Sequence, residues 1–237
     1  MRIARVLGFR LARLSRFLLI AHQPTAARGM NRLDNEIIRL LRPGQGYYVE
    51  LGANDGVAQS NTLVLELFHG WTGLLIEPVP KIFRRLTKNR SRRRNRLVEA
   101  ACVSSSHDGG EVLLAAAGLM STPVGLESDI PDPIRHARSG VKFLRETNEI
   151  SFVQASAMTL TQVLEMAGSP KVISLLSLDV EGAELEVLKG IDFNQYCFEL
   201  IVVESRDVNR LEDFFSSKGY ILSHHLPPLD FFFVPRS

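Results

Sequence analysis

The chain has 237 residues, of which 45% are hydrophobic and 23% are charged, so it can fill one core and is not a disordered tail. Its net charge of +2 conceals two basic segments, residues 1–28 and 78–98, which contain no acidic residue and leave the rest of the chain acidic. Two distant cysteines, Cys102 and Cys197, exclude a disulfide scaffold, and no apolar run reaches the length of about 18 residues that predicts a membrane span, so we expect a cytoplasmic protein.

Residues 1–24 are predicted to form a basic amphipathic helix, appended to a single domain over residues 25–237. Three interpretations stay open: the helix contacts an anionic membrane or a partner through residues 1–20, it packs on its own domain, or the segment is a cleaved or disordered leader. The first would place the protein peripherally at the inner membrane face. At about 100° per residue, Arg2, Arg5, Arg10, Arg13 and Arg16 fall on one arc, and Ile3, Leu7, Leu11, Leu14 and Leu18 fall on the opposite arc.

After residue 24, short apolar runs alternate with segments of helical periodicity. This alternation predicts an α/β fold with a mostly parallel, seven-stranded sheet and helices on both faces. The last two strands are joined through Pro227 and Pro228 without room for a helix, which predicts an antiparallel last strand. Residues 104–149, rich in Gly, Ser and Pro, are expected to be an irregular or lid-like insert. The predicted strands are 47–51, 73–76, 97–103, 172–178, 200–203, 220–224 and 231–234, and the predicted helices are 31–41, 61–69, 80–90, 159–167, 183–189 and 207–217.

A glycine-containing turn over residues 50–56 follows the first predicted strand. Its glycines let the backbone turn tightly and approach a ligand, and the carboxylate of Glu50 suits a cationic group better than a phosphate. Asn54 stands where a dinucleotide-binding turn needs its second glycine, which disfavours a nicotinamide-dependent oxidoreductase. The alternative is an ordinary strand-to-helix turn, in which Gly and Asn supply positive φ angles.

Glu77 ends the second predicted strand and follows Gly56 by twenty-one residues. This is close to the spacing at which an acid binds ribose hydroxyls in nucleotide-binding βαβ units. Pro78 and Pro80 end the strand and begin the next helix. Because the carboxyl ends of parallel strands meet at one edge of a sheet, Glu77 should lie beside the 50–56 turn.

Asp179 ends the predicted strand 172–178, and Glu181 lies in the turn that follows. Two acids at a strand end beside a ligand site favour a functional role, although Asp179 could instead cap the next helix. Glu184 begins that helix, where a carboxylate stabilises the positive end of the helix dipole, so its expected role is structural.

These three segments, with Ser60-Asn61-Thr62 and Gly70-Trp71-Thr72-Gly73 between them, resemble the FkbM-type methyltransferase family over about residues 45–235. The resemblance implies a Rossmann-like class I methyltransferase that uses S-adenosylmethionine to methylate a hydroxyl oxygen, on a sugar, a glycan or a secondary metabolite. It implies that the glycine turn holds the methionine part of the cofactor and that Glu77 holds its ribose. The implied cofactor-binding residues are Glu50, Gly52, Asn54, Asp55, Gly56, Asn61, Glu77, Pro78, Ala101, Cys102 and Asp179, and the implied catalytic residues are Asp179 and Glu181.

An alcohol acceptor must lose a proton, which Asp179 or Glu181 can accept directly; His107, in a Ser-rich loop, is a weaker alternative. We expect no metal ion, with a divalent cation bound by Asp179 and Glu204 as the alternative. A non-catalytic cofactor-binding or scaffold protein that keeps the fold is the competing class of function.

The basic tract over residues 81–96 has a simple interpretation as a solvated helix face. It lacks the interleaved aromatic residues that single-stranded nucleic acids stack on, so no nucleic-acid partner is expected. Together with the amino-terminal arginines, it could instead bring the protein to anionic lipid or to a phosphorylated glycan.

Overall fold

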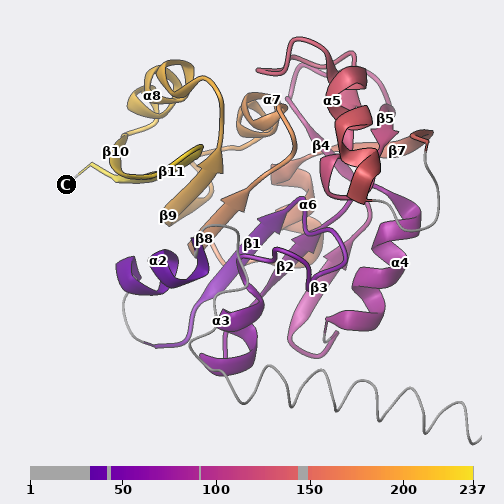
Figure 1. Cartoon of the computed structure of the whole chain (residues 1–237). Coiled ribbons are helices and arrows are strands. Elements are labelled where there is room, and N and C mark those ends of the chain that lie inside the picture. The colour runs from indigo at the N-terminus through magenta and orange to yellow at the C-terminus, as the bar shows by residue number, and fades with distance from the viewer. Residues whose placement is uncertain (1–32, 42–43, 91, 144–148, 237) are drawn as a thin grey trace, which may run out of the picture.

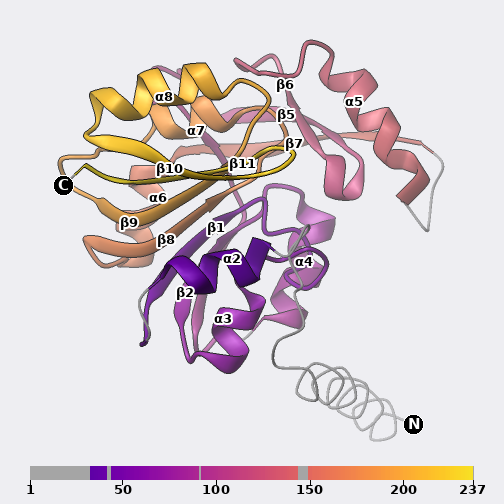
Figure 2. The same cartoon turned by 60° about the vertical axis from the view of Figure 1, so that its left-hand side comes forward.

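The computed structural model describes residues 33–41, 44–90, 92–143 and 149–236. The helix predicted over residues 1–24, and with it the proposed boundary at residue 24, lies outside them. Two sheets organise the described part of the chain, as Figures 1 and 2 show. None of the helices that the structure describes is both long and apolar enough to cross a bilayer.

The main sheet has seven strands and confirms the predicted α/β class. Neighbouring strands are parallel except at β11, which runs antiparallel to β9 on one side and to β10 on the other, as the short Pro227-Pro228 connection predicted. The strand order is β10 (Tyr220–Leu226), β11 (Asp230–Pro235), β9 (Cys197–Glu204), β8 (Val172–Leu178), β1 (Tyr47–Leu51), β2 (Thr72–Ile76) and β3 (Asn95–Val98).

Helices cover both faces of this sheet, because alternate residues of its central strands are buried on opposite sides. Val49 and Leu51 of β1 face one hydrophobic cluster, whereas Tyr48 faces the other. The first cluster is completed by α6 (Leu160–Ala167), α7 (Glu184–Lys189) and α8 (Val208–Ser217), and the second by α2 (Leu33–Leu40), α3 (Leu63–Phe68) and α4 (Pro80–Asn89).

A second, four-stranded sheet corrects two predictions. The run expected as one strand over residues 97–103 is two strands in different sheets, interrupted at Glu99 and Ala100. Residues 104–149 are not an irregular insert, because they supply two strands, a helix and two short 3-10 turns. The elements are β4 (Ala101–Val103), β7 (Ser151–Thr159), β5 (Glu111–Ala116) and β6 (Thr122–Val124) in sheet order, with α5 (Pro133–Gly140), η2 (Gly118–Met120) and η3 (Val141–Phe143).

The missed strand β5 carries the period of a half-buried strand. Val112 and Leu114 are buried, whereas Glu111 and Leu113, which alternate with them, are exposed. The Gly, Ser and Pro residues around this short alternation belong to its turns rather than to a structureless loop. The second sheet is therefore a folded unit, and it lies beyond the carboxyl ends of the main strands.

Candidate functional site

A cavity of about 300 Å³ lies between the carboxyl ends of the main strands and the second sheet. Open α/β sheets bind ligands at this edge. Four strand ends contribute to one side, and β5, β6, η2 and α5 contribute to the other. Of the residues predicted to bind a cofactor or to act in catalysis, those that line the cavity are Gly52, Asn54, Glu77, Pro78, Ala101, Cys102, Asp179 and Glu181.

The turn after β1 needs glycine because another strand end crosses very close to it. A Cβ atom on Gly52 would lie 1.8 Å from the carbonyl oxygen of Asp179, and Gly52 has a φ of +71°. Asn54 also has a positive φ, of 46°, which places it in the left-handed region that Asn tolerates better than most residues. The backbone thus brings the ends of β1 and β8 together at the cavity wall.

Glu50 is buried and does not line the cavity. Its carboxylate accepts hydrogen bonds from the backbone N–H of Asn61 at 2.9 Å and from the hydroxyl groups of Ser60 and Thr62, the latter at 2.6 Å. Its oxygens thus hold the loop before α3, so the structure does not bring Glu50 to the ligand position that the resemblance implied.

Three other predicted residues also lie away from the cavity. Asp55 accepts hydrogen bonds from the backbone N–H groups of Val57 and Ala58, and the side chain of Asn61 donates to Ser177 Oγ. A Cβ atom on Gly56 would lie 2.5 Å from the side chain of Arg90. Asp55, Gly56 and Asn61 therefore fix the shape of the turn from the side that faces away from the cavity, and they do not form its cavity-facing surface.

Arg90 is the centre of a buried polar network beneath the glycine turn. Its guanidinium is wholly buried and donates to Glu66 at 2.6 Å and to the hydroxyl of Tyr48 at 2.7 Å. The remaining acceptors are Ser60 Oγ at 3.0 Å, Thr62 Oγ1 at 3.0 Å and the carbonyl oxygen of Gly56 at 3.2 Å. Arg90 therefore ties the floor of the turn to α3 and β1. Sequence reasoning placed this arginine in a solvated basic tract.

Glu77 faces the cavity from the end of β2, as predicted. Its two carboxylate oxygens accept hydrogen bonds from the backbone N–H groups of Asn54, at 3.0 Å, and Val79, at 2.8 Å. Burial raises the pKa of Glu77 to about 7, although these two backbone donors favour its charged form. The carboxyl group thus joins the turn after β1 to the end of β2 at the cavity wall.

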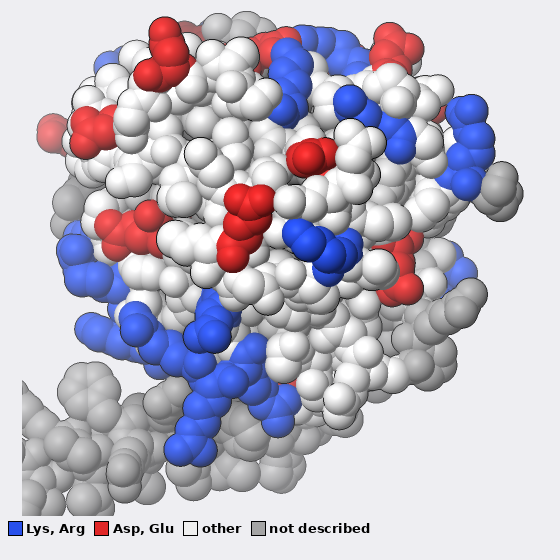
Figure 3. All heavy atoms as spheres, turned by 180° about the vertical axis from the view of Figure 1, so that it is seen from behind, with Lys and Arg blue, Asp and Glu red and all other residues white. Residues whose placement is uncertain are grey.

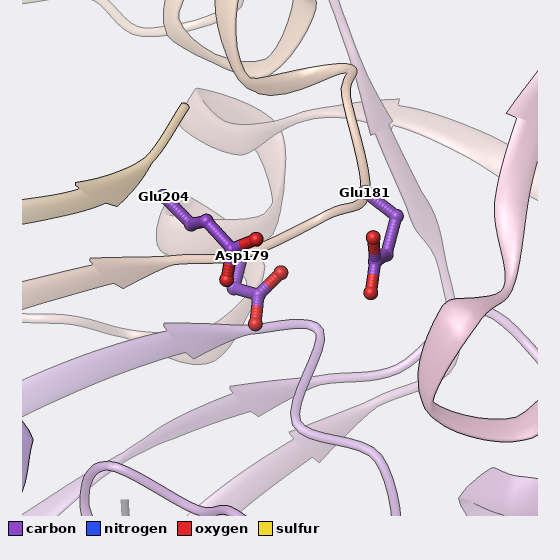
Figure 4. A group of neighbouring side chains, drawn as sticks. All are labelled: Asp179, Glu181 and Glu204. Carbon is purple, nitrogen blue, oxygen red and sulfur yellow. The ribbon is translucent and has the colours of Figure 1, made fainter. Parts of the chain in front are cut away.

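Asp179, Glu181 and Glu204 form an acidic cluster at the ends of β8 and β9, shown in Figure 4. One oxygen from each lies within 4.8 Å of the others. Burial raises the pKa of all three carboxyl groups, that of Glu181 to about 7. Repulsion from Glu204 adds to this rise for Asp179 and Glu181, and repulsion from Asp129 adds to it for Glu204. The Arg206 guanidinium lies 3.9 Å from Glu181 and 3.7 Å from Glu204 and offsets part of this repulsion.

The metal alternative has the geometry it requires. The predicted pair, Asp179 and Glu204, is close enough to bind one divalent cation, and Glu181 would be a third oxygen ligand. Similar groups of carboxylates also occur in proteins that bind no ion, so a metal-assisted reaction stays a prediction.

Glu184 has the structural role that was expected of it. One of its oxygens accepts hydrogen bonds from the backbone N–H groups of Val180, at 3.0 Å, and Gly182, at 3.1 Å. These bonds close the turn that carries Glu181 and hold that residue at a φ of 56°.

Sequence reasoning missed two ionisable residues of the cavity, His136 and Arg206. Arg206 follows Glu204 by two residues, so the strand-end argument used for Asp179 and Glu181 could have found it. His136 lies on α5 within the presumed irregular insert, where no periodic pattern marked it. His107, the alternative base, does not line the cavity, and among the described residues its buried Nε2 has no hydrogen-bond partner.

Comparison with known families finds one that covers most of the chain. Residues 50–222 match the family model described as the methyltransferase FkbM domain. Among curated proteins, none matches the chain.

Solved structures of methyltransferases are also similar. The first is M. capricolum TrmK in complex with S-adenosyl-homocysteine, at 9% identity and a TM-score of 0.46, covering 85% of this chain and 65% of that one. The second is methyltransferase FkbM from Methylobacillus flagellatus KT, at 14% identity and a TM-score of 0.46, covering 83% of this chain and 45% of that one. The chain thus spans less than two thirds of the length of either.

Proposed function

The chain belongs to the FkbM methyltransferase family, and from this premise we propose that it transfers a methyl group from S-adenosylmethionine to a hydroxyl oxygen of a sugar, a glycan or a secondary metabolite. The observation that carries the proposal is the meeting of three predicted motifs, represented by Gly52, Glu77 and Asp179, at one cavity. A non-catalytic protein that keeps the fold and binds the cofactor is the competing function.

The residues of the cavity fit this cofactor. Glu77 presents a carboxyl group whose only hydrogen bonds from described residues come from backbone N–H groups, so it has capacity to accept from two ribose hydroxyls. Gly52 lines the cavity and lets the turn after β1 lie against the backbone of Asp179, so that both strand ends face the same ligand position. The acidic cluster that includes Asp179 suits a ligand with positively charged groups.

When bound, S-adenosylmethionine would supply a methyl group on a cationic sulfur, which a nucleophilic oxygen displaces in line. The protein then has two tasks, to align the acceptor oxygen and to remove its proton. Asp179 and Glu181 line the cavity, and burial raises their pKa values, which makes them better proton acceptors than an exposed carboxylate. We assign the acidic cluster a part in this proton transfer.

Incubation with methyl-labelled S-adenosylmethionine and a panel of sugars, glycans and hydroxylated metabolites tests this proposal. We expect label to appear in at least one hydroxyl-bearing compound as a base-stable ether. Tight cofactor binding without transfer to any acceptor would favour the non-catalytic protein, and transfer to nitrogen or carbon would contradict O-methylation.

Replacement of Glu77 with alanine is expected to weaken S-adenosylmethionine binding by about 1 to 3 kcal/mol, the cost of removing a charged hydrogen-bond acceptor. Because the pKa of Glu77 is raised to about 7, the carboxylate forms as the pH rises through 7, and wild-type affinity should increase over that range. Calorimetric titration between pH 6 and pH 8 measures both effects.

Glu99 provides the matched control, because it is exposed and does not line the cavity. Its charge is one of the factors that raise the pKa of Glu77. Glu99→Gln should therefore leave affinity at pH 8 unchanged and shift the pH dependence slightly downwards. Equal affinities of wild type and Glu77→Ala would mean that Glu77 does not bind the ribose.

We further propose a peripheral contact with an anionic membrane through residues 1–20, the part of the predicted basic helix that would touch it. Those residues lie outside the described structure. The exposed basic side chains of α4, of β3 and of the turn between them support the proposal, since Lys and Arg gather on one face in Figure 3 and residues 78–98 contain no acid. These side chains are Lys81, Arg84, Arg85, Lys88, Arg92, Arg93, Arg94 and Arg96.

Sedimentation with vesicles tests this contact. Each basic group near an anionic surface adds about 1 kcal/mol, so the full chain should sediment with phosphatidylserine vesicles and be released by high salt. Removal of residues 1–24, or replacement of Arg84, Lys88, Arg92 and Arg93 with glutamine, should reduce sedimentation without changing cofactor affinity. If neither change alters sedimentation, or if neutral vesicles bind equally well, the proposal is wrong.

A further inference from the structure

His136 and Glu181 form a hydrogen-bonded pair at the cavity, although they come from opposite sides of it. His136 lies on α5, which packs against β5 and β6 of the second sheet, and Glu181 lies on the turn after β8. The imidazole Nε2 is 2.7 Å from Glu181 Oε2, and only 14% and 15% of the two side-chain surfaces are exposed. A carboxylate that accepts from one imidazole nitrogen fixes the tautomer and the orientation of the ring.

The helix that carries His136 is seated firmly. Asp132 caps its amino end by accepting from the backbone N–H of Arg135 at 2.9 Å. Ala137 is fully buried, and a Cβ atom on Gly140 would lie 2.7 Å from Cβ of Met120 in η2. The backbone therefore fixes where the imidazole stands at the cavity.

Glu181 is held toward this histidine in an unusual backbone conformation. Its φ of 56° lies in the left-handed region, which a glutamate occupies only where the surrounding structure enforces it. The enforcing contacts are the Glu184 hydrogen bonds and the next residue, Gly182, where a Cβ atom would lie 2.5 Å from Ser128 Oγ. Such conformations concentrate at functional sites.

The charged groups around His136 favour a neutral imidazole. Glu181 and Arg206 face it from the ends of β8 and β9, and Glu204 and Asp129 add negative charge. Burial, and then Arg206, lower the pKa of His136 below its usual value of 6.5. An ionised Glu181 would accept the proton on Nε2, which leaves Nδ1 as an unprotonated nitrogen.

We propose that His136 is the general base of the methyl transfer and that Glu181 is the residue that positions it. The inference rests on the proposed function and deepens it. As the acceptor oxygen bonds to the methyl carbon, the carbon–sulfur bond breaks and its electron pair stays on sulfur. The hydroxyl proton passes to Nδ1 of His136, and the resulting imidazolium is paired with the Glu181 carboxylate.

Turnover of the acceptor found in the hydroxyl panel tests the base. His136→Asn keeps a polar side chain of similar reach but cannot accept the proton, so turnover should fall by about a hundredfold or more while cofactor affinity stays within severalfold. Glu181→Gln, which removes the charge that positions the imidazole, should lose no more turnover than His136→Asn does and should shift the acidic limb of the pH profile. The control His107→Asn, away from the cavity, should behave as wild type.

A nitrogen-15 NMR measurement on the imidazole tests the pair without any acceptor. We expect the ring of His136 in the wild-type protein at pH 7.5 to be neutral and protonated on Nε2, and this preference to weaken in Glu181→Gln. A proton on Nδ1, or turnover unchanged in His136→Asn, would overturn the assignment. Absence of transfer by the wild-type protein would instead contradict the proposed function and leave the NMR result to decide the pair.

Discussion

Replacement of Arg90 with methionine is expected to lower the free energy of unfolding by about 3 to 5 kcal/mol, the usual cost of removing one partner of a buried ion pair. The loss is large because Arg90 pairs with Glu66 at 2.6 Å and lies 3.6 Å from Glu50, both of which are buried. Without the guanidinium, two carboxylates would remain in the interior with no cation beside them. Urea unfolding monitored by circular dichroism measures the change.

Arg84 is the matched control, since it lies on the same helix, α4, but is exposed. Arg84→Met should change stability by about 0.5 kcal/mol or less. Arg90→Lys, which keeps the charge but loses the forked donors, should lie between the two and remain foldable if Arg90→Met does not. Equal stability of Arg90→Met and Arg84→Met would mean that the network does not support the turn.

A loss of turnover is also expected for the substitutions Asp179→Asn and Glu181→Gln. At least one of them should lower turnover by about a hundredfold or more while cofactor affinity stays within severalfold, because each keeps the side-chain shape and removes a charge that the proposed proton transfer needs, either on the base or on the group that positions it. Neither should unfold the protein. Asp179 is surrounded by Glu204, Glu181, Glu184 and Asp230, all of which raise its pKa, so its replacement removes repulsion.

The pattern of the two effects locates the proton acceptor. A large loss in Glu181→Gln that His136→Asn matches or exceeds agrees with the pair inferred above, whereas a loss confined to Asp179→Asn places the base on Asp179. Unchanged turnover in both variants would move the base elsewhere. If a chelator also abolishes turnover, the result favours the metal-assisted reaction over proton removal by a side chain alone.

The sign of the pH effect on stability follows from the same raised pKa values. An exposed Glu has a pKa near 4.5, whereas burial raises those of Glu77 and Glu181 to about 7 and that of Glu184 to about 8. The folded protein therefore binds these protons more tightly than the unfolded chain does. Their contribution to stability is greatest below pH 4.5 and declines as the pH rises toward 8.

The strand ends were predictable because an apolar run and the turn residues that bound it can be recognised from a few consecutive residues. Tyr47–Leu51 and Val172–Leu178 read as buried strands, and topology then brings Gly52 and Asp179 together. The direction in which the Glu50 side chain points was not predicted. Side chains alternate along a strand, so Glu50 shares the face of Tyr48 and points toward Arg90, whose role no nearby residue reveals.

The side of the cavity formed by β5, β6, η2 and α5 depends on contacts between distant parts of the chain. Leu113 of β5 pairs with Gln154 of β7, which follows β5 in the sequence only after α5. The Gly, Ser and Pro residues between the two strands obscured the short alternation of buried and exposed residues in β5. His136 reaches Glu181 only because this unit lies across the cavity from the carboxyl ends of the main strands. Sequence patterns of period 2 or 3.6 carry no information on such a meeting.

The most direct test of the account is calorimetric titration of the wild-type protein with S-adenosylmethionine, S-adenosyl-homocysteine and a nicotinamide dinucleotide, because it examines the cavity without requiring the acceptor. We predict one site for each of the first two ligands, weakened in both cases by Glu77→Ala, and no binding of the dinucleotide. Binding of the nicotinamide dinucleotide in place of both sulfur-containing ligands would contradict the account.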